Sequence, residues 1–93
     1  MNKNIIDKKS FLEIVHAFQT LCLEDDVENF MLDLFTEAEL AALSKRWCIL
    51  KLLKKGYSQR AVAKDLNVGL CKITRGAKIL KNNKSIVIKF LKD

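Results

Sequence analysis

The sequence contains little of what interrupts helices or builds catalytic and metal sites. It has no proline, three glycines and one histidine in 93 residues, while 49% of its residues are hydrophobic and 30% are charged. This composition excludes the low-complexity and disordered classes. The single histidine, His16, has no cysteine at metal-ligand spacing, and no Gly-rich phosphate loop is present. We therefore expect a folded protein that is not an enzyme and that uses no metal or cofactor.

Cysteines and long apolar runs are also scarce. Cys22, Cys48 and Cys71 are an odd number at wide spacing within apolar helical patterns, which predicts reduced, mostly buried thiols. No uncharged run approaches the ~20 residues of a membrane helix, and residues 1–7 lack the apolar core of a signal peptide. The length suits one small domain. The sequence thus predicts a single cytoplasmic domain over residues 1–93, with no membrane segment.

Charge is unevenly distributed along the chain. Residues 1–43 have three lysines against nine acidic residues, a net charge of −6, whereas residues 44–93 have fourteen lysines and arginines against two aspartates, a net charge of +12. Such an excess of positive charge favours binding to a polyanion, above all to nucleic acid. A solvated lysine-rich surface is the alternative. The acidic half is expected to have another task.

Helical periodicity dominates the sequence, so the predicted fold class is all-α. Capping boxes at residues 10–13 and 36–39, and acidic residues at 24–26, indicate three helix starts. Ser58 can cap a further helix, and the residues 67–69 indicate a turn. We expect six helices, over residues of about 10–22, 24–35, 37–55, 58–66, 70–81 and 85–91.

The apolar stripes of these helices predict where they pack. In the third helix the stripe is expected to face the core and consists of Leu40, Leu43, Trp47, Leu50 and Leu53. At this spacing Trp47 predicts core packing rather than a surface on which bases stack. The first two helices have more apolar surface than so small a chain covers easily, which predicts a homodimer. Packing within the monomer is the alternative.

Residues 59–75 match a helix-turn-helix, the DNA-reading unit of many regulators. The contacts between its two helices are predicted to come from four apolar residues: Val62, Leu66, Val68 and Ile73. Ala63 is small where the helices cross, and Asn67 tolerates the positive φ that the turn requires. A protein-interaction module with the same geometry is the alternative.

The second helix of this motif is expected to meet double-stranded DNA. Arg60, at the start of the first motif helix, can reach a guanine edge, whereas Lys81 can only neutralise phosphate. The predicted DNA-binding residues come from both helices of the motif: Gln59, Arg60, Ala63, Leu70, Cys71, Lys72, Thr74, Lys78 and Lys81.

Several short motifs together resemble one known family. They are Leu34-Phe35-Thr36, Arg46, Gly56-Tyr57-Ser58-Gln59-Arg60, Ile73-Thr74-Arg75-Gly76 and Leu80-Lys81. In order and almost in spacing, over residues of about 33–81, they resemble the Trp repressor family. The resemblance implies an intertwined, six-helix dimer that binds L-tryptophan as corepressor.

The resemblance also implies a set of corepressor-binding residues. The indole would lie between Arg46 and Arg75, whose guanidinium groups can stack on a ring and pair with a carboxylate. Gly76 would let the ligand approach the backbone, and Leu34, Phe35 and Thr36 would supply an apolar wall and carbonyls for the ammonium group.

Two further pocket positions depart from the family, which commonly has hydroxyl residues where this chain has Lys72 and Ile79. A hydrogen bond lost at Ile79 costs about 1 kcal/mol if nothing replaces it. Lys72 adds a cation near the carboxylate or points to DNA. Each residue also has a simpler interpretation: Arg75 as a phosphate contact, Arg46 as a surface cation, Gly76 as a packing point and Thr36 as an N-cap.

These expectations combine into one functional hypothesis. Residues 10–57 would form the dimerisation helices, residues 58–81 the DNA-reading head and residues 85–93 a C-terminal helix. The protein would be a repressor of tryptophan biosynthesis or transport genes that binds a palindromic operator with L-tryptophan as corepressor. A ligand-independent helix-turn-helix regulator and a protein-interaction module are the alternatives.

Overall fold

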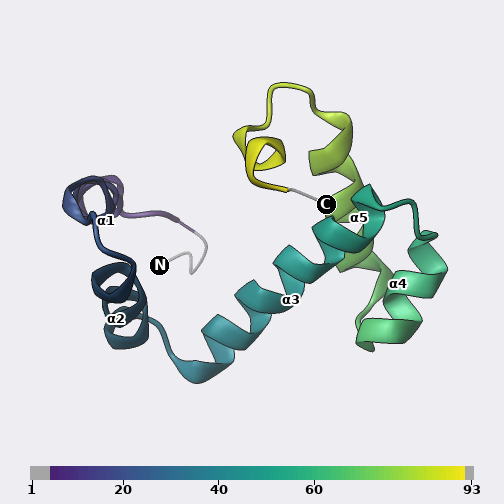
Figure 1. Cartoon of the computed structure of the whole chain (residues 1–93), viewed down its shortest axis with the longest axis horizontal. Coiled ribbons are helices and arrows are strands. Elements are labelled where there is room, and N and C mark those ends of the chain that lie inside the picture. The colour runs from purple at the N-terminus through teal and green to yellow at the C-terminus, as the bar shows by residue number, and fades with distance from the viewer. Residues whose placement is uncertain (1–4, 92–93) are drawn as a thin grey trace. The chain divides into compact units, whose positions relative to one another are not determined.

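The computed structural model describes residues 5–91, and every regular element in that range is helical (Figure 1). The elements are α1 (Lys8–Thr20), α2 (Glu24–Leu34), α3 (Glu37–Lys54), α4 (Gln59–Leu66), α5 (Leu70–Lys81) and the 3₁₀ helix η1 (Ile86–Phe90). The predicted all-α class is confirmed. The prediction of a sixth α-helix is wrong, because residues 86–90 form a single short 3₁₀ segment. Its β-branched run, Ile86-Val87-Ile88, explains the weak α-helical tendency.

Contacts divide the chain into two compact units, Met1–Glu37 and Ala38–Asp93. The predicted subdivision at residues 57–58, within a single domain, stays a prediction. In the part of the chain that is described, no helix is both long and apolar enough to cross a membrane.

The first unit contains α1 and α2, which pack through two aromatic rings. Phe18 and Phe30 meet edge to face, with ring centroids 5.1 Å apart and an interplanar angle of 69°. Neither helix has a buried residue. The acidic first turn predicted for the second helix is confirmed as Glu24, Asp25 and Asp26.

The start of α1 differs from the prediction. The helix begins at Lys8 after Asp7, and the Ser10 hydroxyl donates a hydrogen bond to the Asp7 carboxylate, with Oγ and Oδ2 2.6 Å apart. Ser10 is therefore inside the helix and is not its N-cap, so the capping box predicted at residues 10–13 is wrong. Asp7 and Ser10 stand three residues apart, which is the spacing that lets their side chains meet on one helix face.

The second unit has a core made where α3, α4 and α5 meet. Ile49, Val62 and Ile73 are at most 2% exposed, and five partly buried residues pack on them: Leu52, Leu53, Ala63, Leu66 and Val68. All four apolar contacts predicted for the helix-turn-helix belong to this cluster. The predicted packing of the motif is confirmed.

The apolar stripe of α3 is only partly buried. Leu50 is 3% exposed, as expected of the core, but Leu43 and Trp47 remain 38% and 39% exposed. Ile49 lies off the predicted stripe and is nevertheless 2% exposed. The expectation that Trp47 is a core residue is therefore wrong for this chain alone. The reason is that Ile49 packs with Val62 of α4 and Ile73 of α5 in the core cluster, whereas Leu43 and Trp47 do not belong to that cluster.

The connections confirm the predicted turn chemistry. Ser58 Oγ accepts a hydrogen bond from the Ala61 amide at 3.1 Å and caps α4. Asn67 ends α4 in the left-handed region with φ 53° and ψ 53°. Gly56, after α3, has φ 102°, and a Cβ placed on it would meet nothing within 4 Å. These three residues set the path from α3 into α4 and α5.

The end of the described chain, at Leu91, packs inside the second unit and is hydrogen-bonded to α3. Leu91 is 2% exposed, and its carbonyl accepts a hydrogen bond from the Lys54 ammonium at the end of α3. The cysteines differ from expectation, because Cys22 and Cys71 are exposed and Cys48 is half-buried. All three are free thiols, but they are not mostly buried.

Candidate functional site

A cavity lies between one face of α3 and one face of α5, entirely within the second unit. It is a small cavity of about 60 Å³ that is open to solvent on one side. The lining positions of α3 are 42, 45, 46 and 49, and those of α5 are 72, 75, 76 and 79. Spacings of three and four residues place each set on a single helix face. The two helices therefore form opposite walls.

The lining combines apolar residues with cations. The apolar or side-chain-free part consists of Ala42, Ile49, Gly76 and Ile79, and the cationic part of Lys45, Arg46, Lys72 and Arg75. All four cationic residues are exposed, so the charged groups stay in contact with water. The cavity therefore suits a ligand with an apolar body and an anionic group.

Gly76 explains how the two walls come so close. A Cβ on this residue would lie 2.9 Å from Ile49 Cγ2 and 3.5 Å from Leu53 Cδ1. The first distance is shorter than side-chain packing allows, and Ile49 is a β-branched core residue with little freedom to move. Gly76 is thus a packing point between α3 and α5, which is the simpler of the two interpretations considered for it. It also lines the cavity.

Five of the predicted corepressor-binding residues line this one cavity: Lys72, Ile79, Arg46, Arg75 and Gly76. Sequence reasoning missed three lining residues, Ala42, Lys45 and Ile49. A signal for them existed, because 42, 45 and 49 share the helix face of position 46. Whether the lining binds a corepressor stays a prediction at this point.

The other three predicted pocket residues belong to the first unit. Leu34 is the last residue of α2, Phe35 follows it with extended backbone, and Thr36 directly precedes α3. Leu34 is 48% exposed, and Phe35 is half-buried. Their predicted role as an apolar wall and as acceptors for an ammonium group stays a prediction.

The candidate DNA surface follows the exposed sides of α4 and α5. Eight of the nine predicted DNA-binding residues are exposed: Gln59, Arg60, Leu70, Cys71, Lys72, Thr74, Lys78 and Lys81. Ala63 is half-buried and packs against the core cluster, as expected of a small residue where helices cross. Its predicted DNA contact stays a prediction.

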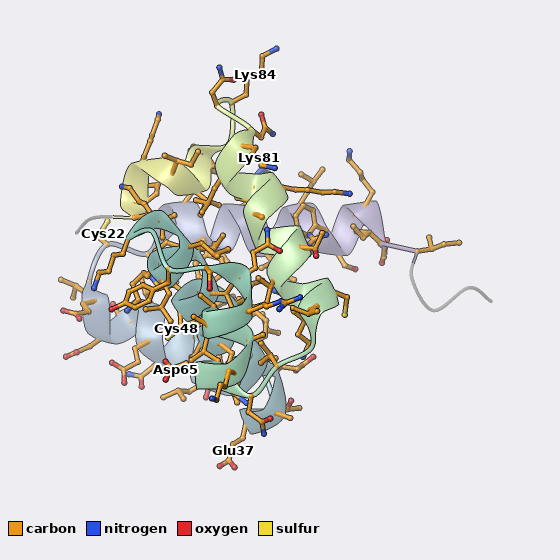
Figure 2. The ribbon with its side chains drawn as sticks, turned by 90° about the vertical axis from the view of Figure 1, so that its right-hand side faces the viewer. Cys22, Glu37, Cys48, Asp65, Lys81 and Lys84 are labelled. Atoms are coloured by element: carbon orange, nitrogen blue, oxygen red, sulfur yellow. The ribbon has the colours of Figure 1, made fainter. Side chains whose placement is uncertain are left out.

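Charge is arranged unevenly within this unit. Figure 2 shows Lys81 and Lys84 at one end and Asp65, on α4, at the other. Within α5, Lys72, Arg75, Lys78 and Lys81 repeat every three residues, and no acidic residue interrupts them. A surface of this kind attracts phosphate groups along a nucleic acid backbone.

Two local hydrogen bonds constrain residues at this surface. The Thr74 hydroxyl donates to the Leu70 carbonyl at 3.0 Å, so it can accept from a ligand but must break this bond to donate to phosphate. Gln59 and Arg60 occupy the first turn of α4, which Ser58 caps. The cap fixes the direction in which this first turn leaves the loop.

Comparison with known proteins decides the family. The family model described as "Trp repressor protein" matches residues 9–93. The chain belongs to the Trp repressor family. The family is one of DNA-binding regulators and not of enzymes.

Curated relatives agree with this assignment. A "Trp operon repressor homolog" of Chlamydia trachomatis serovar L2 is 35% identical over 72 residues, which cover 72% of this chain and 77% of the relative. A protein of the same name from serovar D is 36% identical over 70 residues, covering 70% of this chain and 74% of the relative. No solved structure matches the chain significantly. The helix-turn-helix and the cationic cavity are thus features of a Trp repressor family member.

Proposed function

We propose that this protein represses transcription by binding operator DNA as a homodimer, with L-tryptophan as corepressor. The observation that carries the proposal is that Arg46 of α3 and Arg75 of α5 line the same cavity. Each guanidinium group can lie against the face of an indole ring and pair with a carboxylate. Ile49 and Ile79 offer apolar surface to the ring. Operator DNA and tryptophan together make the cytoplasm the expected place of action.

The ligand would act by fixing the reading helix. A zwitterion has no net positive charge with which to attract DNA, so its effect must come through the position of α5. A ring held between α3 and α5 favours the arrangement in which both arginines contact it. The resulting population shift is limited by the differential affinity for the two arrangements, and a hundredfold preference corresponds to about 2.7 kcal/mol.

The homodimer proposal rests on apolar surface that this chain does not cover. Phe11 and Leu32 in the first unit are 48% and 56% exposed, and Leu43 and Trp47 on α3 are more than one-third exposed. Large side chains gain free energy when they leave water, at about 25 cal/mol per Å². A second copy of the chain is the partner that also supplies a second reading head. Two heads would then read half-sites about 34 Å apart.

The test is calorimetric titration of L-tryptophan with and without DNA enriched by the protein from a random double-stranded pool. Linkage requires that DNA raise tryptophan affinity by the same factor by which tryptophan raises DNA affinity. Arg46→Ala and Arg75→Ala should each abolish the saturable heat measured without DNA. Arg60→Ala is the matched control, because Arg60 lies on α4 and does not line the cavity.

Other outcomes would select another function. Tryptophan heat that is absent at millimolar ligand, with specific DNA binding intact, would indicate a ligand-independent regulator. Failure to enrich any sequence and failure to bind DNA at low salt would indicate a protein-interaction module instead.

A further inference from the structure

The cavity between α3 and α5 has more cationic side chains than the single carboxylate of a zwitterionic ligand can pair with. Two arginines are sufficient to pair with one carboxylate. Lys45 and Lys72 line the same cavity in addition. Among the eight lining residues there is no acidic side chain and no neutral hydrogen-bonding side chain.

The cations form two pairs, one on each wall. Lys45 and Arg46 are neighbours on α3, and Lys72 and Arg75 are three positions apart on α5. Ile49, Gly76 and Ile79 provide the apolar part of the lining. A ligand that places a ring on this apolar surface can therefore direct negative charge to cations from both helices.

We propose that this cavity binds an aromatic ligand carrying two negative charges, such as an aryl phosphate monoester, more tightly than a zwitterionic aromatic amino acid. The inference rests on the proposed function in one respect, since it takes the same cavity to be the ligand site. It adds a ligand class and assigns Lys45 and Lys72 as the residues that select it.

Electrostatics gives the expected order of affinity. An ammonium group in this cavity would lie among four cations, whereas a second negative charge would be attracted by all of them. Partly hydrated ion pairs are weak, so each lysine is expected to contribute about three- to fivefold in affinity. The dianion should therefore bind about tenfold more tightly than a monoanion with the same ring, and the zwitterion more weakly than either.

The experiment uses calorimetric titration of the full chain with three probes of decreasing negative charge. They are 1-naphthyl phosphate and 1-naphthylacetate, which share a ring, and L-tryptophan. Lys72→Gln and Lys45→Gln should each weaken naphthyl phosphate binding about three- to fivefold and change naphthylacetate binding less than twofold. The matched control is Lys64→Gln, an exposed lysine on α4 that does not line the cavity. Retained naphthylacetate binding shows that each variant is folded.

A pH series gives a second readout that a purely structural role would not change. The second ionisation of a phosphate monoester lies near pH 6. Between pH 7.5 and pH 5 the advantage of naphthyl phosphate over naphthylacetate should therefore shrink towards zero. In Lys45→Gln/Lys72→Gln it should be small at both pH values.

Three results would overturn the inference. Naphthyl phosphate could bind no more tightly than naphthylacetate, or the cavity lysine variants could match Lys64→Gln. Lys45→Gln and Lys72→Gln could also lower DNA affinity without changing the binding of naphthyl phosphate, which would assign the two lysines to phosphate contacts on DNA. If tryptophan still strengthens DNA binding in any of these cases, the corepressor proposal stands and only the dianion inference fails. If no aromatic probe binds, both fail together.

Discussion

The two units of this chain differ in how they bury apolar surface. In Met1–Glu37, neither α1 nor α2 has a buried residue, and the two helices meet through the Phe18–Phe30 pair. In Ala38–Asp93, three helices close around Ile49, Val62 and Ile73. The basic unit thus contains its own core, whereas the acidic unit has amphipathic helices without one. In the homodimer proposed above, a second copy would supply the buried contacts that the first unit lacks, whereas the second unit already has a core of its own.

The largest expected effect concerns the core of the basic unit. Ile73→Ala removes a side chain that is 0% exposed, and we expect it to lower the free energy of unfolding by about 3 kcal/mol through lost burial and a residual cavity. Urea denaturation at fixed protein concentration measures the change. Ile86→Ala is the matched control, since Ile86 is 64% exposed and its loss should cost below about 0.5 kcal/mol. Equal effects of the two variants would contradict a self-contained core.

The next largest effect tests the acidic unit. Leu12 is 41% exposed on α1, and Leu12→Glu would place a charge in the proposed dimer interface. We expect the dimer dissociation constant to rise about a hundredfold, because an unpaired charge is costly to bury. Sedimentation equilibrium measures the shift, with Gln19→Glu, an exposed position on the same helix, as control. If Leu12→Glu dissociates no more readily than the control, α1 is a solvent-facing helix.

A smaller effect is expected for two variants that distinguish base contacts from phosphate contacts in the basic unit. Arg60→Ala should relax base preference at one position per half-site by about 1–3 kcal/mol, whereas Lys81→Ala should weaken all sequences alike and reduce the salt slope by about one unit per subunit. Binding to enriched and scrambled DNA over a range of salt concentrations measures both. A loss of specific and non-specific binding in equal measure in Arg60→Ala would show that Arg60 does not read a base.

The smallest effect concerns the crossing of α3 and α5. Gly76→Ala places a methyl group 2.9 Å from Ile49 Cγ2, and we expect a net loss of about 1 kcal/mol after the gain in helix propensity is included. Thermal denaturation measures the stability, and titration should show weaker ligand binding because the walls of the cavity shift. Gly69→Ala is the control, since its Cβ would meet only Cys71 Sγ, at 3.8 Å. If the two variants are equally stable, the crossing has room to adjust.

The sequence predicted best what is decided locally. Ser58 as a cap and Asn67 at positive φ follow from side-chain and backbone chemistry within a few residues. Five residues of the predicted pocket line one cavity, and they follow from the resemblance to the Trp repressor family. The contacts of Val62 and Ile73, by contrast, follow from the fixed geometry of the motif. Short-range geometry leaves few alternatives at such positions.

The wrong predictions have two causes: neighbouring residues compete to begin a helix, and the buried face of a helix depends on the elements that pack against it. Ser10 is a good capping residue, yet the helix begins earlier, where Asp7 accepts its hydroxyl. Ile49 was missed and Trp47 was misplaced because the buried face of α3 depends on which helices cover it. Helical periodicity identifies an apolar stripe but does not identify the residues that another helix reaches.

The backbone conformation of Gly56, in the loop after α3, determines whether an L or a D residue fits at this position. Its φ of 102° disfavours L side chains, yet no atom occupies the place where a Cβ would stand. The restriction is thus one of chirality and not of space. A D-alanine introduced by chemical ligation would match this backbone and reduce the freedom of the unfolded chain. This position of the protein can therefore accept a mirror-image residue where it resists an ordinary one.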